Sequence, residues 1–213
     1  FRTIFELPVQ DPTNTHLHGA HYDQYNDTVW VCNGDMKPAC NLWYSHNWRD
    51  DNPTWNQVWT TGTAPVQFTS IFATETQILL GSDGVGIDGL YALDRNPQET
   101  YRNPILKDVL ILGARDALDV ARGFMTTRNN EVYVVFSSKG THPSSILGSK
   151  NGIDWHIVYQ TADTVLDVMN IVDNTLIIMH DDSDGPKIRL MDVDWNQVLI
   201  SSKLVKGRLI TNN

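Results

Sequence analysis

Three phrases of the sequence share one form: Thr54-Trp55-Asn56-Gln57-Val58-Trp59, Asp154-Trp155-His156-Ile157-Val158-Tyr159 and Asp194-Trp195-Asn196-Gln197-Val198-Leu199. Each begins with a short polar residue and Trp and continues into residues that favour strands. The tryptophans are spaced for a repeat of about 40 to 50 residues with one degenerate copy near Tyr101. Self-similarity of this length indicates copies of one supersecondary unit that pack against each other.

Four short strand candidates, rich in β-branched and aromatic residues, fill each of four units. The units cover residues 16–60, 66–112, 118–160 and 165–201. Their connections carry pairs such as Asn26-Asp27, which accept the positive φ that tight hairpins need. Because a four-stranded sheet cannot bury both faces alone, neighbouring sheets must stack. The sequence therefore predicts one all-β domain over residues 1–213, a β-propeller of four-stranded antiparallel blades.

The expected strands follow the same order in every unit. They are 16–23, 28–33, 41–45 and 55–60, then 66–73, 77–81, 89–93 and 108–112, then 118–125, 131–137, 145–149 and 155–160, then 165–172, 175–180, 187–191 and 197–201. Residues 1–9 resemble the outermost strand of a preceding blade, and residues 204–211 resemble the innermost strand of a following one. Two interpretations stay open. Either these ends pair in a partial fifth blade, or the chain is a fragment of a larger propeller.

Charge and hydropathy exclude two classes of partner. The formal net charge is -9, and the 16 Lys and Arg residues form no run that could follow a phosphate backbone, which argues against nucleic-acid binding. The apolar runs, such as Val109–Leu112 and Leu176–Met179, are strand-sized and too short for insertion into a membrane. A homo-oligomer or a larger assembly stays open.

Cys32 and Cys40 are the two cysteines of the chain. The segment between them contains Gly34 and Pro38, so a hairpin could bring the two sulfurs within disulfide distance. The alternative is two free thiols. Two cysteines alone do not make a zinc site.

The segment Ser149-Lys150-Asn151-Gly152-Ile153-Asp154-Trp155 places Ser, then Asn, Gly and Trp at the spacing of a known turn motif. In this respect the chain resembles the BNR or Asp-box propellers of the sialidase-like superfamily. Ser45-His46-Asn47 followed by Thr54-Trp55 looks like the same turn with an insertion, and Asp182-Ser183-Asp184-Gly185 is a weaker match.

In that family the motif is a folding element whose polar side chains bind backbone groups of the hairpin while the Trp packs between sheets. The resemblance thus implies structural roles for Ser149, Asn151, Gly152, Trp155, Trp55 and Trp195.

The segment His16-Leu17-His18-Gly19 and the later Asp35 resemble the start of such propellers, where inner strands face a central channel. Alternation puts His16 and His18 on one face of the innermost strand. With Asp35 they could bind a ligand or a divalent metal, because imidazole and carboxylate are suitable ligands. The alternative is a hydrogen-bonded polar cluster in the channel wall.

A sialidase-like hydrolase requires an arginine clamp for a carboxylate, a Tyr activated by a Glu, and an Asp as general acid or base. Phe1-Arg2-Thr3-Ile4 resembles the Phe-Arg-Ile-Pro element of sialidases but lacks the Pro. The glutamates Glu6, Glu75, Glu99 and Glu131 stand in no matching phrase. The sequence thus favours a protein without enzymatic activity, with a sialidase-type glycoside hydrolase as the alternative.

Recognition of a glycan or a protein receptor is the function that the sequence favours, because loops on a stiff scaffold commonly carry binding. His46, Trp48 and Arg49 lie in the long connection from Ser45 to Thr54 and suit sugar stacking and hydrogen bonding. Trp48 could instead fold back over the blade edge. Low lysine content, acidic charge and the missing initiator Met agree with a secreted propeller or a phage or virion fibre. A purely structural virion module is the further alternative.

Overall fold

The computed structural model describes residues 2–6, 17–34, 40–59, 67–82, 89–96, 101, 104, 106–111, 120–126, 131–137, 144–161, 164–172, 175–182, 185–196 and 204–205. Regular structure in these ranges is strand, apart from helical backbone at Trp195 and Asn196. All strand pairs with a described register are antiparallel. The all-β prediction is confirmed for the described part of the chain, which contains no helix long and apolar enough to span a membrane.

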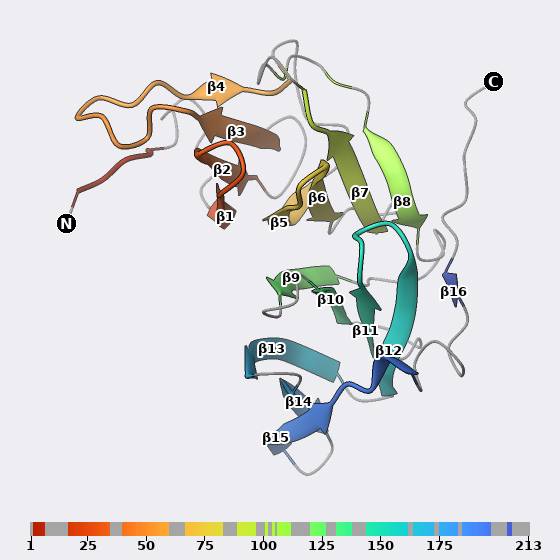
Figure 1. Cartoon of the computed structure of the whole chain (residues 1–213). Coiled ribbons are helices and arrows are strands. Elements are labelled where there is room, and N and C mark those ends of the chain that lie inside the picture. Colours follow the sequence, from red (N-terminus) through yellow and green to blue (C-terminus); the bar gives the residue numbers. More distant parts are fainter. Residues whose placement is uncertain are drawn as a thin grey trace. The chain divides into compact units, whose positions relative to one another are not determined.

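Four sheets, each built mainly from consecutive strands, make up this structure (Figure 1). The first has the order β1 (Leu17–Asp23), β2 (Thr28–Asn33), β3 (Asn41–Ser45) and β4 (Asn56–Gln57). The second has the order β5 (Phe68–Ala73), β6 (Gln77–Ser82), β7 (Gly89–Asp94) and β8 (Lys107–Ile111).

The third sheet has the order β16 (Leu204–Val205), β12 (Trp155–Thr161), β11 (Ser144–Ser149), β10 (Val132–Ser137) and β9 (Val120–Thr126). The fourth has the order β13 (Thr164–Val172), β14 (Thr175–Asp182) and β15 (Gly185–Asp192). The strand expected over 197–201 lies outside the described residues. Each sheet is therefore mainly a meander of consecutive strands, as the sequence repeat predicts.

The end of the chain departs from the expected arrangement. Leu204 and Val205 pair antiparallel with His156 and Trp155, so β16 becomes a fifth strand of the third sheet. The sequence placed residues 204–211 in a following or closing blade. The described residues of the N-terminal segment, Arg2–Glu6, have no strand conformation.

Two compact units divide the chain, and the single domain over residues 1–213 stays a prediction. The first comprises residues 1–84 and 91–107, and the second comprises residues 85–90 and 108–213. In the first unit β1 and β2 pack on β5. A Cβ atom on Gly19 of β1 would lie 3.4 Å from the Thr69 carbonyl oxygen of that neighbouring sheet, so the small residue permits the close approach.

A buried ion pair also joins the elements of the first unit. Arg95 donates from Nη1 and Nη2 to the two carboxylate oxygens of Asp23, at 2.7 and 2.8 Å. Its Nε donates to the Thr74 carbonyl at 2.8 Å. The Asp23 side chain is 1% exposed and that of Arg95 is 12% exposed. This pair ties the end of β1 to the turn between β5 and β6 and to the end of β7.

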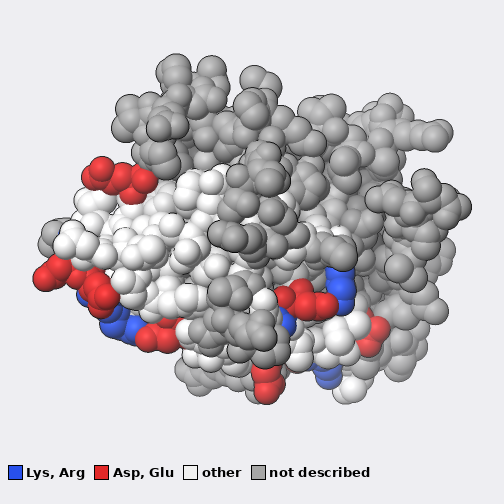
Figure 2. Space-filling model, turned by 90° about the horizontal axis from the view of Figure 1, so that it is seen from above, with Lys and Arg blue, Asp and Glu red and all other residues white. Residues whose placement is uncertain are grey.

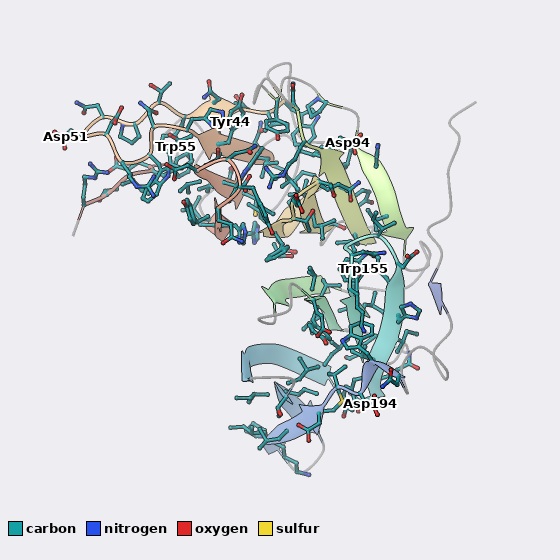
Figure 3. All side chains as sticks on the ribbon, viewed as in Figure 1. Tyr44, Asp51, Trp55, Asp94, Trp155 and Asp194 are labelled. Atoms are coloured by element: carbon teal, nitrogen blue, oxygen red, sulfur yellow. The ribbon has the colours of Figure 1, made fainter. Side chains whose placement is uncertain are left out.

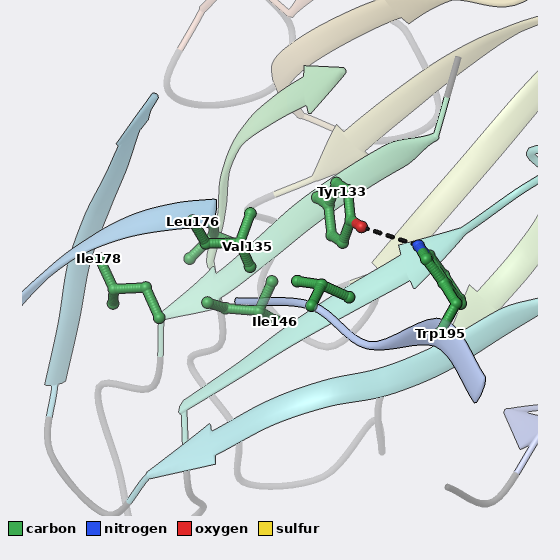
Figure 4. Close-up of a cluster of buried hydrophobic side chains, with 7 residues drawn as sticks. Tyr133, Val135, Ile146, Leu176, Ile178 and Trp195 are labelled. Carbon is green, nitrogen blue, oxygen red and sulfur yellow. Dashed lines mark hydrogen bonds between the residues drawn. The ribbon is translucent and has the colours of Figure 1, made fainter. Parts of the chain in front are cut away.

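The core of the second unit lies between the third and fourth sheets (Figure 4). Its buried members are Tyr133, Val135, Ile146, Leu176, Ile178, Val193 and Trp195. Trp195 Nε1 donates to the Tyr133 hydroxyl at 3.1 Å, which satisfies the indole N–H inside the core. Trp195, predicted as a structural tryptophan, thus locks the segment after β15 onto β10.

Candidate functional site

A compact polar turn joins β11 to β12. The Ser149 hydroxyl accepts from the N–H of Gly152 at 2.9 Å and lies 3.1 Å from Asn151 Oδ1, to which it donates. Asn151 Oδ1 also accepts from the N–H of Asp154 at 2.8 Å, while Asn151 Nδ2 donates to Asp154 Oδ2 at 2.9 Å. Gly152 has φ 73°, a value that favours glycine. Trp155 follows, fully buried.

The turn between β3 and β4 repeats the three hydrogen bonds made by the Asn side chain. The Ser45 hydroxyl donates to Asn47 Oδ1 at 3.2 Å, and Asn47 Nδ2 donates to Asp50 Oδ2 at 3.0 Å. Asn47 Oδ1 accepts from the N–H of Thr54 at 2.8 Å. In the β11–β12 turn a single residue, Asp154, supplies both the carboxylate and the N–H. Here Asp50 and Thr54 divide these two roles.

The β3–β4 turn is therefore the β11–β12 turn enlarged by an insertion between Asn47 and Thr54. The shorter β11–β12 turn closes with the same Asn-centred hydrogen bonds, so a turn of this kind does not require an insertion to close. Asp51 lies at the tip of the enlarged turn, and Trp55 lies where the chain returns toward the sheet (Figure 3). The insertion carries Trp48 and Arg49, two of the residues predicted to bind a ligand.

Trp48 and Arg49 meet the β1–β2 hairpin in an exposed cluster with Tyr22 and Asp27, named the aromatic–arginine cluster. The Arg49 guanidinium lies 4.0 Å from the Trp48 ring centroid and 5.9 Å from that of Tyr22. The two rings meet edge to face with centroids 5.6 Å apart. Trp48 is half-buried by these contacts, while Tyr22 stays 45% exposed.

Asp27 is the centre of hydrogen bonding in the cluster. Its carboxylate accepts from Arg49 Nη1, from the Tyr22 hydroxyl at 3.0 Å and from Trp48 Nε1 at 3.3 Å. The hydrogen bond from Arg49 is the main cause that lowers the pKa of Asp27, which keeps the carboxylate charged. The φ of Asp27 is 49°, as expected for a residue of the Asn26-Asp27 turn.

The other residues predicted to bind a ligand lie elsewhere. His46 is exposed, but its Nδ1 lies 2.8 Å from the Thr28 hydroxyl and its ring packs on Tyr44, so it does not join the cluster. His18 Nε2 donates to the Gly34 carbonyl at 3.0 Å, a bond that agrees with the polar-cluster alternative. His16 and Asp35 lie outside the described residues.

No group of three His, Cys, Asp or Glu side chains within the described ranges is placed to hold a metal ion. The divalent-metal site at His16, His18 and Asp35 stays a prediction, because two of its three members are not described.

Both cysteines are buried free thiols, which is the second of the two alternatives. In the β2–β3 register Cys32 stands opposite Leu42, two residues beyond Cys40, and Cys40 Sγ lies 3.4 Å from the Gly34 carbonyl. The two thiols therefore do not face each other across the hairpin. Burial raises the pKa of the Cys32 thiol to about 12, which keeps it protonated and unreactive.

A phenol–carboxylate pair of the kind a sialidase uses is present, but in the core. The Tyr133 hydroxyl donates to Glu131 Oε2 at 3.1 Å. Tyr133 is 0% exposed and Glu131 is 7% exposed. Burial, and then the nearby Glu131 charge, raise the pKa of Tyr133, so its phenolate is disfavoured. The pair stabilises the core and has neither the access nor the acidity of a nucleophile.

Sequence reasoning missed Tyr22 and Asp27 as members of the candidate site. The Asn26-Asp27 pair marks a turn, but nothing in the sequence says that this turn lies beside the insertion. The contact arises because β1, β2 and β3 are adjacent in one sheet. The sequence signal that was available is Tyr22 beside the β1–β2 turn, two strands away from the long polar connection between Ser45 and Thr54.

The fold and the cluster define an all-β protein with an exposed aromatic–arginine surface. Neither a protein-family model nor a curated protein sequence matches the chain. Among solved structures, a GH43 beta-1,3-galactosidase is similar, with a TM-score of 0.49 and 11% sequence identity. The match covers 84% of this chain and 47% of that enzyme, so the chain spans about half of its length.

Proposed function

We propose that the chain is part of an Asp-box β-propeller and that it recognises a glycan, without cleaving it, through the aromatic–arginine cluster. One observation carries the proposal: a half-buried Trp48 and an exposed Arg49 stand on an insertion into a turn whose β11–β12 counterpart closes without one. A segment that the fold does not need, but that gathers such side chains at the surface, is typical of a binding element.

Two features support the propeller interpretation. The sheets are antiparallel meanders that follow the sequence repeat, and strands of neighbouring sheets are in contact inside each unit. The β3–β4 and β11–β12 turns share the Ser and Asn hydrogen bonds of an Asp-box frame.

The chemistry of the cluster suits a hydroxyl-rich ligand. The rings of Tyr22 and Trp48 provide flat apolar surface for the C–H face of a sugar. Arg49 and Asp27 provide hydrogen-bond donors and acceptors whose charges balance, so they can bind hydroxyl groups without requiring a charged sugar. A glycan receptor of this kind fits the secreted or virion-surface setting that the sequence favours.

A glycan array probed with the purified chain tests the proposal, together with a panel of fluorogenic glycosidase substrates on the same preparation. Trp48→Ala should weaken array binding by about tenfold or more, because it removes a stacking ring and a hydrogen-bond donor. Ile153→Ala is the matched control, since Ile153 is 63% exposed on the equivalent β11–β12 turn. It should leave binding unchanged.

A turn exchange makes the test sharper. Replacing residues 48–54 with the sequence Gly-Ile-Asp of residues 152–154 should give a folded chain that no longer binds. Substrate turnover would overturn the non-catalytic part of the proposal. Absence of array binding by the natural chain would overturn glycan recognition and favour a protein receptor or a purely structural module.

A further inference from the structure

The described N-terminal segment, Arg2–Glu6, lies against the enlarged turn that carries the aromatic–arginine cluster. Three contacts anchor it. Trp55 Nε1 donates to the Ile4 carbonyl at 2.7 Å. The Phe5 ring packs edge to face on Trp55, with centroids 4.6 Å apart, and lies 5.9 Å from Trp43. The anchor therefore joins the segment to residues at both ends of the turn, on β3 and just before β4.

From this anchor Arg2 reaches the backbone of the insertion itself. Its Nη2 donates to the Trp48 carbonyl at 3.0 Å and its Nη1 donates to the Arg49 carbonyl at 3.1 Å. A further contact, 3.5 Å to Asp51 Oδ1, is an exposed ion pair, with side chains 40% and 101% exposed, and adds little. The two hydrogen bonds to carbonyls are charge-assisted, and they hold the backbone of Trp48 and Arg49, which supply two of the four side chains of the cluster.

We infer that the Arg2–Glu6 segment fixes the recognition turn in its binding conformation and that Arg2 is a positioning residue for the site. This inference rests on the proposed function. Arg2 holds the peptide groups of Trp48 and Arg49, so it sets the direction in which both side chains leave the backbone. A turn that is already ordered loses less conformational freedom when a ligand binds, so this contact raises affinity without touching the ligand.

The contacts of Arg2 differ from the carboxylate-binding role that the sequence around it suggests. Phe1-Arg2-Thr3-Ile4 resembles a sialidase element, whose implied role is to clamp a substrate carboxylate. Here the guanidinium binds two backbone carbonyls and one aspartate. Its donors are directed at the protein's own turn.

Hydrogen–deuterium exchange on the full chain tests the inference without any glycan. Arg2→Ala should speed exchange of the amides of residues 48–52 by about tenfold, the equivalent of 1.4 kcal/mol in local opening, with the amides of β2 and β3 unchanged. Arg2→Lys, which keeps one donor group but cannot bridge two carbonyls, should fall between. Thr3→Ala, at an exposed position of the same segment, should match the natural chain. Unchanged exchange in Arg2→Ala would overturn the inference.

Two further arms separate this inference from the proposed function. Trp55→Phe keeps the ring contact with Phe5 but removes the hydrogen bond to Ile4, and it should also speed amide exchange in residues 48–52. On the glycan array, Arg2→Ala should reduce the signal of the natural chain by about tenfold. Faster exchange with an undiminished array signal would overturn the positioning role. An array without signal for the natural chain would overturn the proposed function while the exchange result still decides whether the segment orders the turn.

Discussion

His21 lies on β1 with its ring centroid 4.9 Å from that of Phe72 on β5. Burial lowers the pKa of His21, and the nearby Asp23 charge opposes this only in part. In the unfolded chain a histidine has a pKa near 6.5, so at a pH between the two values the unfolded chain binds the extra proton. The stability that neutral His21 contributes is therefore complete above about pH 6.5 and is lost as the pH falls through the folded pKa.

We predict that His21→Phe, which keeps an aromatic contact with Phe72, makes the stability of the chain less dependent on pH between about 7 and 5. Urea unfolding followed by circular dichroism at a series of pH values measures this. The natural chain should lose more stability over that interval than the variant. Equal slopes for the two proteins would show that His21 is not the titrating group.

Gly148 shows how one missing atom permits the core of the second unit. A Cβ atom at this position would lie 2.9 Å from Tyr133 Cε1 and from Val158 Cγ1, and 3.0 Å from the ring of Trp195. Gly148→Ala should therefore destabilise the chain by about 1–3 kcal/mol through overpacking. Gly19→Ala is the comparison, because its nearest neighbours lie at 3.4 Å, and the loss should be smaller. The denaturant midpoints of the two variants measure this difference, and the midpoint of Gly148→Ala should be the lower one.

For single residues, the sequence predicted backbone conformation and a place at the surface better than it predicted which side chains contact each other. The Asn26-Asp27 turn took the positive φ expected of it. Trp48 and Arg49 lie together in one surface cluster, the first half-buried and the second exposed, whereas His46 contacts Thr28. A side chain's partners depend on which strands become adjacent, and that information is not local in the sequence.

Among strands and turns, the ion pair of Asp23 and Arg95 joins β1, the β5–β6 turn and the end of β7 in the first unit. Asp23→Asn would leave the Arg95 guanidinium without its counter-charge at a site where it is mostly buried. Loss of about 3 kcal/mol is expected for such an uncompensated charge. Asp94→Asn is the control, because the Asp94–Lys107 pair is exposed and should contribute less than about 1 kcal/mol. Thermal unfolding of both variants provides the measurement, and equal losses would contradict the assignment.

The bounds of β2 and β3 agree with those expected from the sequence, because each is a short run of consecutive apolar residues bounded by polar residues. β4 is limited to Asn56 and Gln57, where a strand of six residues was expected over 55–60. Residue 60 lies outside the described residues. At the start of the strand, Trp55 is not part of β4 and its indole contacts Ile4 and Phe5 of the N-terminal segment, a long-range contact that a local pattern does not record.

Charge acts at the scale of the whole molecule. On the face drawn in Figure 2, the Lys and Arg atoms of the described residues form small separate groups, with Asp and Glu beside several of them. With a net charge of -9 the chain should repel a phosphate backbone. We predict no shift of single-stranded or double-stranded DNA in an electrophoretic assay at physiological salt. A complex that weakens steeply with added salt would contradict this.

The pairing of β16 with β12 has a consequence for biosynthesis. Strands β9–β12 are synthesised before residues 204 and 205, whose partners are residues 155 and 156. Until β16 is made, the outer edge of β12 presents unpaired backbone N–H and carbonyl groups at these two residues, a template for association with another chain. The arrival of β16 covers the start of this edge, so slow translation after residue 161 would lengthen the period in which residues 155 and 156 are open to association.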